Sequence, residues 1–131
     1  DTAGSAQATV ITDVITDPAA GNARAKFFNG IPNAGGNVDL YVTITGGATS
    51  LLASNIAYKA TSGYFEFPAG GATLTFAVVR AGMPNVAANQ LATYLFTASQ
   101  AGRVYTILSR GFVIASTTDI RRPFVSLIVN R

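Results

Sequence analysis

The chain of 131 residues contains no histidine, no cysteine and no tryptophan, and it has only six carboxylates. Without histidine there is no imidazole to act as a base near neutral pH, and without cysteine there are no disulfides and no Cys-type zinc sites. The carboxylates are scattered singly, as Asp1, Asp13, Asp17, Asp39, Glu66 and Asp119. We therefore expect no catalytic residues, no metal site and no cofactor, and we expect the protein not to be an enzyme.

Short catalytic motifs are missing as well. The many serines and threonines include no Gly-x-Ser-x-Gly elbow, and no Asp-x-Asp-x-Asp loop is present to bind calcium. Asp39 belongs to the outward face of a predicted strand, where an acid-base role would need a partner that the sequence does not supply.

Charged residues are scarce, at 11%, whereas apolar residues reach 49%. This composition indicates one globular domain whose surface is polar but largely uncharged, as is common in exported bacterial β proteins. No apolar run approaches the length of about 20 residues that spans a bilayer. The small, polar opening 1–7 resembles a tether after a removed targeting segment or lipid anchor. We expect an extracytoplasmic location, with membrane attachment only through an anchor outside this chain.

The charges are also unevenly distributed. Residues 1–22 carry three aspartates and no base, giving −3. Residues 103–131 carry five arginines against Asp119, giving +4; they are Arg103, Arg110, Arg121, Arg122 and Arg131. Because they are neither clustered with lysines nor placed on a basic helix, we expect no nucleic-acid partner and interpret them as solvated residues that protect strand ends.

Alternating hydrophobicity predicts the architecture. The clearest strand is 38–44, with Val38, Leu40, Val42 and Ile44 on one face. Further strands are predicted at 24–29, 64–67, 72–78, 91–97, 103–109 and 124–129, separated by turns rich in glycine and proline. The repeated Val-Ile-Thr-Asp of residues 10–17 favours an additional strand over a helix, because β-branched side chains suit strands.

These seven or eight strands predict an all-β fold, an antiparallel β-sandwich of the immunoglobulin-like or a similar Greek-key kind. A closed barrel is the alternative. Residues 1–22 form the expected tether and possible extra strand, and residues 23–131 the single sandwich domain. The six residues expected to face its core are Leu40, Val42, Phe65, Phe67, Leu74 and Phe76.

Several segments resemble a known family. They are Phe27-Phe28-Asn29-Gly30-Ile31-Pro32, Val38-Asp39-Leu40-Tyr41-Val42, Leu52-Ala53-Ser54-Asn55-Ile56-Ala57-Tyr58, Ser62-Gly63-Tyr64 and Phe67-Pro68-Ala69-Gly70, followed by Gln100-Ala101-Gly102-Arg103-Val104-Tyr105-Thr106. In order and spacing they resemble domain of unknown function 4397, which occurs in bacterial secreted proteins and lipoproteins. The resemblance implies an extracytoplasmic β-sandwich and brings no activity or catalytic residues with it. The loop 45–50 is longer than the family's usual turn.

Tyrosines are the candidate binding residues. Tyr41, Tyr58, Tyr64 and Tyr94 fall outside or at the margin of the core pattern, and exposed tyrosines stack on sugars or anchor interfaces. Cross-strand pairing on a solvated sheet face is the alternative role. We expect a non-enzymatic interaction or adhesion module at the cell envelope, binding an envelope or extracellular protein through loops 31–37 and 81–89. The alternative is a carbohydrate-binding module that recognises a polysaccharide through a coplanar array of these tyrosines.

Overall fold

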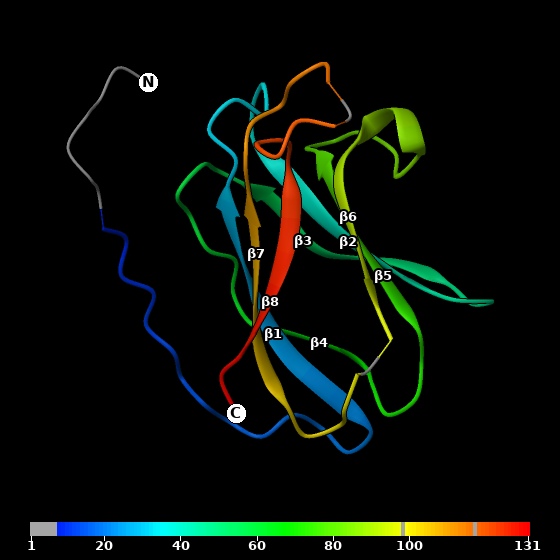
Figure 1. The fold of residues 1–131 in the computed structure, drawn as a ribbon. Helices are drawn as coiled ribbons and strands as arrows, with labels where there is room; N and C mark the ends of the chain where they lie inside the picture. The colour runs from blue at the N-terminus through cyan, green and yellow to red at the C-terminus, as the bar shows by residue number, and fades with distance from the viewer. Residues whose placement is uncertain (1–7, 98, 117) are drawn as a thin grey trace.

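The computed structural model describes residues 8–97, 99–116 and 118–131, which form eight β-strands in two four-stranded sheets (Figure 1). The elements are β1 (Asn22–Gly30), β2 (Val38–Ile44), β3 (Thr49–Ile56), β4 (Phe65–Pro68), β5 (Leu74–Arg80), the 3₁₀ turn η1 (Ala87–Asn89), β6 (Gln90–Phe96), β7 (Val104–Arg110) and β8 (Phe124–Val129). One sheet has the order β4-β1-β7-β8 and the other β3-β2-β5-β6. The predicted sandwich is confirmed, and because the strands fall into two separate sheets the barrel alternative is wrong.

Strand pairing is antiparallel with one exception. β1 and β7 are parallel, from Arg24 opposite Val104 to Gly30 opposite Arg110. Parallel neighbours need a long connection, and here the intervening strands β2 to β6 supply it. The expectation of a purely antiparallel sandwich is corrected at this pair.

The core lies between the sheets and is rich in aromatic rings. Of the six residues predicted to face it, Phe65 is partly buried and packs against the core, and the other five are buried. The Phe67 ring meets Phe76 edge-on at 5.4 Å between centroids, and Phe96 meets Tyr105 in the same way at 5.5 Å. Edge-to-face contacts of this kind join the two sheets at their centre.

The structure differs from the prediction in two segments, one predicted strand that does not form and one strand that was not predicted. Residues 8–19 form no strand, so the strand predicted at 10–17 is wrong, and the tether expected at 1–7 lies outside the described residues. Conversely, β3 was not predicted, because its sequence lacks regular alternation; in the structure β2 and β3 pair with two register shifts. β3 forms because the turn at Gly46 and Gly47 folds it back onto β2, whose edge would otherwise be unpaired.

Turn residues act as the sequence predicts. Asn29 is fully buried, and its side chain accepts from the Ile31 amide at 3.1 Å and donates to the Ile56 carbonyl at 3.1 Å. This amide therefore fixes the exit of β1, as expected for asparagine at a turn. In the turn after β4, Gly70 and Gly71 have φ of 90° and 111°, which glycine adopts without strain.

The long loops gather at one end of the sandwich. Val38 lies opposite Arg80, and Gly30, Arg110 and Phe124 lie side by side, so the loops 31–37, 81–89 and 111–123 share that end. β1 begins at the opposite end, where the C-terminus also lies (Figure 1). No helix in the described part of the chain is long and apolar enough to cross a membrane.

Candidate functional site

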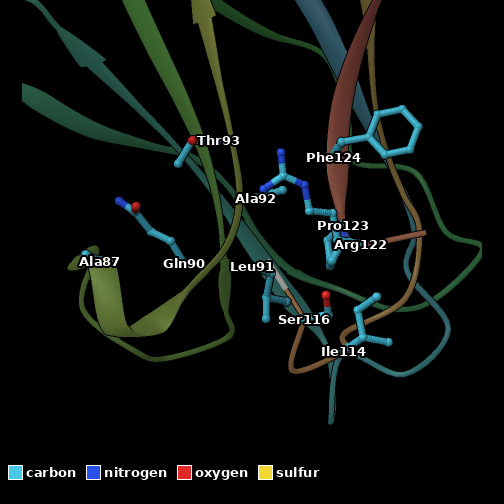
Figure 2. A pocket seen from close by; sticks show the side chains of 10 residues that line it. All are labelled: Ala87, Gln90, Leu91, Ala92, Thr93, Ile114, Ser116, Arg122, Pro123 and Phe124. Atoms are coloured by element: carbon cyan, nitrogen blue, oxygen red, sulfur yellow. The ribbon is translucent and has the colours of Figure 1, made fainter. Parts of the chain in front are cut away.

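One side of the sandwich, which we call the seam, is formed by β6 and β8, the last strands of their sheets. The two strands pack against each other, and a groove of about 390 Å³ lies at each end of the contact. The loop-end groove is lined by Ala87, Gln90, Leu91, Ala92, Thr93, Ile114, Ser116, Arg122, Pro123 and Phe124 (Figure 2). The base groove is lined by Tyr94, Phe96, Gln100, Arg103, Tyr105, Leu127 and Val129.

The loop-end groove is mostly polar. Gln90 and Thr93 come from β6, whereas Ser116 and Arg122 come from the loop that leads into β8, on the other side of the groove (Figure 2). The Phe124 ring at its rim lies under the Arg110 guanidinium, 4.4 Å from the ring centroid. This groove offers hydrogen-bond donors and one exposed cation to an occupant.

The base groove is more apolar. Tyr94 and Phe96 line it from β6, with ring centroids 6.3 Å apart, and Leu127 and Val129 line it from β8. Arg103 is exposed at its rim and donates through Nε to the Gln100 side chain at 3.0 Å. The groove thus pairs an aromatic and aliphatic lining with a single cation.

The four outer strands differ in how well they are protected against further pairing. β3 carries two register shifts and a left-handed residue, Asn55 at φ 59°, and β4 has only four residues and ends in Pro68. By contrast, β8 pairs with β7 without a register shift, and β6 has one register shift, between Ala92 and Gln90 at its start. Like β3, both strands lack charged residues. Bulges, shortness and proline are common protections of edge strands, so the seam carries the two exposed edges best suited to add a strand.

Exposed apolar side chains accompany these edges. Leu95 of β6 and Val129 of β8 are each 60% exposed, and Ile128 is 49% exposed. Residues of this kind are normal when scattered singly, but here they lie on the two edge strands of one side, and Val129 also lines the base groove. The seam is therefore the candidate interaction surface.

The four candidate tyrosines do not come together. Tyr41 lies on the outer face of β2, and Tyr58 is exposed in the loop after β3. Tyr64, just before β4, lies under Arg24 and Lys26, at 4.6 and 5.4 Å from its ring centroid. Tyr94 alone of the four lines one of the two grooves. The coplanar array expected of a sugar platform is not formed by these residues.

Residues 8–19 lie as an extended segment against the outer face of β4 and β1. The ammonium of Lys26, which is only 3% exposed, contacts Asp13 Oδ1 and the Thr12 carbonyl, each at 2.5 Å. The Tyr64 hydroxyl accepts from the Val14 amide at 3.1 Å and donates to Asp13 at 3.2 Å. Side chains, rather than a β-ladder, therefore hold this segment in place.

Asp39 has a structural role that the sequence did not reveal. It lies on the outer face of β2 as predicted, yet it is buried, which corrects the expectation of an isolated, outward carboxylate. Its two oxygens accept from the Asn55 amide at 2.7 Å and the Gly82 amide at 3.0 Å. The carboxylate thus joins the irregular end of β3 to the turn after β5, and we find no acid-base partner among these contacts.

The two loops proposed for binding differ in how exposed their side chains are and in whether they reach the grooves. In the loop 31–37, Ile31 and Ala34 are buried, and the Asn33 side chain bonds the backbone of Val113 in both directions, at 2.8 and 2.9 Å. In the loop 81–89, Met83 and Val86 are 43% and 50% exposed, and Ala87 lines the loop-end groove. The second loop borders the seam and the first does not contribute to either groove.

The five arginines of residues 103–131 are exposed and lie near strand ends, as predicted. Arg121 pairs with Asp119 at 2.7 Å, Arg131 with Asp17 at 2.6 Å, and Arg110 covers Phe124. Arg103 and Arg122 remain beside the two grooves. Within the described residues, no three carboxylates gather into a group that could bind a metal ion.

Three carboxyl groups have lowered pKa values. Hydrogen bonding to Lys26 lowers the pKa of Asp13, and the side chain of Asn22 with the Ala19 amide lowers that of Glu66. Arg121, through its side chain and backbone, lowers the pKa of Asp119 to about 2. Asp119 therefore stays ionised down to about pH 2, and Asp13 and Glu66 stay ionised to a lower pH than ordinary carboxyl groups.

We therefore expect the chain to lose stability only in acid. Because the folded pKa values lie below the ordinary values of 3.8 and 4.5, the stability that these groups contribute is present above those values. It is lost as the pH falls through the folded pKa values, toward about 2 for Asp119. Urea unfolding midpoints between pH 8 and pH 2 test this. A decline confined to the acid range is expected, whereas a decline between pH 8 and 6 would contradict it, since the chain has no histidine.

Comparison with known proteins adds no relative. No protein-family model matches the chain, and no curated protein matches it significantly. The class that the structure defines is an all-β sandwich of eight strands with one pair of unprotected outer strands. The resemblance to domain of unknown function 4397 stays a prediction from the sequence.

Proposed function

We propose that the protein is a non-enzymatic interaction module that works outside the cytoplasm, at the bacterial cell envelope, and that it binds a protein partner through the seam. The observation that carries the proposal is that two uncharged, unprotected outer strands and two grooves lie on the same side of the sandwich. Strand addition at such an edge supplies main-chain hydrogen bonds, while the adjoining grooves select side chains. The scarcity of charge and the family resemblance support the location.

A carbohydrate-binding role is the second candidate, and the base groove is the observation that favours it. Tyr94, Phe96 and Tyr105 line this groove beside Arg103 and Gln100, a combination of rings and polar donors that suits a sugar. Because Tyr41, Tyr58 and Tyr64 lie elsewhere, the groove would hold a short stretch of polysaccharide rather than a long one.

Binding to intact bacterial cells and to extracted surface polysaccharide tests both candidates. We would compare the labelled full-length chain with Leu95→Lys and Ile128→Lys, which place a charge on the seam, and with Leu51→Lys, a matched control on β3 that is 50% exposed. Each seam variant is expected to weaken binding to cells by about tenfold or more, as a charge does at an apolar interface, with Leu51→Lys unchanged.

If the two seam variants and Leu51→Lys all bound cells as tightly as the natural chain, the proposed role of the seam would be contradicted. Binding to polysaccharide alone, lost on Tyr94→Ala, would favour the carbohydrate-binding candidate instead.

A further inference from the structure

The segment 10–17 has the sequence of a strand but no strand partner. Its residues are mainly β-branched, and Val10, Val14 and Ile15 are 89%, 60% and 40% exposed. Within the described part of the chain, residues 8–18 make no backbone–backbone hydrogen bond, and side-chain contacts such as Asp13 to Lys26 and Asp17 to Arg131 hold the segment. The Asp17–Arg131 pair is exposed and contributes little to stability, whereas Lys26 is buried beneath Asp13, so moving the segment exposes this ammonium. Pairing with a strand edge would offset that loss with main-chain hydrogen bonds, which the segment lacks here.

The seam offers the complementary feature, a strand with one unpaired edge. β8 is regular and uncharged, and it pairs with β7 on one side, while no strand of the described residues pairs with its other side. Its outward residues are Phe124, Ser126 and Ile128, and arginines stand at both ends of the strand, Arg122 before it and Arg131 after it. An exposed strand with these properties is a template for a further strand.

The side chains of the segment 10–17 are complementary in polarity to those around the outer edge of β8. In an extended chain, Val10, Thr12, Val14 and Thr16 share one uncharged face, and Ile11, Asp13, Ile15 and Asp17 share the other. Placed beside β8, the uncharged face can lie over the grooves. On the other face, the two isoleucines would then lie beside Phe124 and Ile128. The two aspartates of that face would lie near the arginines at the ends of β8. β6 has no arginine within the strand or directly before or after it, so the acidic segment favours β8.

We propose that residues 10–17 of one copy add as a strand to the outer edge of β8 of a second copy, so that the partner in the proposed interaction is this same chain. This inference rests on the proposed function of the seam. The linker is held at the β4 side of the sheet, where Ala19 donates to Glu66 at 3.2 Å and Ala69 donates to the Gly21 carbonyl at 3.0 Å. Because Asp17 also pairs with Arg131 just after β8 in the same chain, the experiment below has to separate pairing between copies from pairing within one chain. β4 and β8 are the opposite edges of that sheet.

Disulfide trapping tests the proposal, because the chain has no cysteine of its own. Full-length Ile15→Cys would be mixed under oxidising conditions with full-length Ile128→Cys, and in parallel with Ser126→Cys, so that each copy carries one thiol. The matched controls are Leu95→Cys on β6 and Leu51→Cys on β3, which are also exposed. Since disulfides form only at close range, we expect a heterodimer yield at least about tenfold higher for β8 than for either control.

Proline provides an independent variant. Thr16→Pro removes a backbone donor from the segment, whereas Thr9→Pro lies just outside it, and neither residue is part of the sandwich. Thr16→Pro, but not Thr9→Pro, is expected to abolish the trapped heterodimer and the concentration-dependent increase in mass seen by light scattering. Circular dichroism and the thermal midpoint should stay unchanged in both.

Equal trapping at β8 and the controls, trapping only within a chain that carries both cysteines, or a wholly monomeric protein would overturn the inference. If one of these results appeared while Ile128→Lys still weakened binding to cells, the seam would keep its proposed function with another partner. Loss of both effects would overturn the proposed function as well.

Discussion

Replacing Phe76 with alanine is expected to lower the free energy of unfolding by about 3–5 kcal/mol. Phe76 is fully buried at the centre of the core, in edge-on contact with Phe67 of the opposite sheet and 6.3 Å from the Phe96 ring. Its removal leaves a cavity between two sheets whose strands cannot move together without breaking their ladders. Urea unfolding of the purified chain gives the free-energy difference.

The control for Phe76→Ala is Leu95→Ala on the neighbouring strand β6, where the side chain is 60% exposed. A surface truncation of this kind should change the stability by less than about 0.5 kcal/mol. A loss below about 1 kcal/mol for Phe76→Ala would place that ring outside the core and contradict the register of β5.

Replacing Asp39 with alanine is expected to cost about 2–4 kcal/mol, because two backbone amides lose a charged acceptor at a buried position. The amides are those of Asn55 and Gly82, which lie in segments far apart in the sequence but joined through this carboxylate. Chemical unfolding gives the magnitude, and hydrogen exchange at the two amides reports whether their local protection is lost.

Asp39→Asn serves as the matched variant, since it keeps the shape and one acceptor but not the charge. We expect a smaller loss than for alanine. If Asp39→Ala were as stable as the natural chain while both amides stayed protected, the structural role assigned to this carboxylate would be wrong.

The core and most strands could be predicted because their sequences alternate, as β2 and β5 show most clearly. β3 could not, since Thr49–Ile56 has no regular pattern and depends on pairing with β2 through irregular register. The segment 10–17 was mistaken for a strand of the sandwich for the opposite reason. Its β-branched composition is suited to a strand, but a strand also needs an edge to pair with, and sequence does not say which edge is available.

The candidate site was harder still to predict. Tyrosine exposure can be guessed from alternation, but whether Tyr41, Tyr58, Tyr64 and Tyr94 converge depends on how the two sheets are ordered. Only Tyr94 lies in the seam, because β6 is the last strand of its sheet. The lack of charge in β6 and β8 was visible in the sequence, and it gains meaning only once both are known to be outer strands.

The central claim is that β8 is a binding edge, and hydrogen exchange of the full-length chain, measured in dilute and in concentrated solution, tests it most directly. Added strands protect backbone amides on both partners. We predict slower exchange at high concentration in the peptides covering 124–129 and 10–17, with no change in 49–56. Unchanged exchange in 124–129, or protection that appears at β3 instead, would contradict the account.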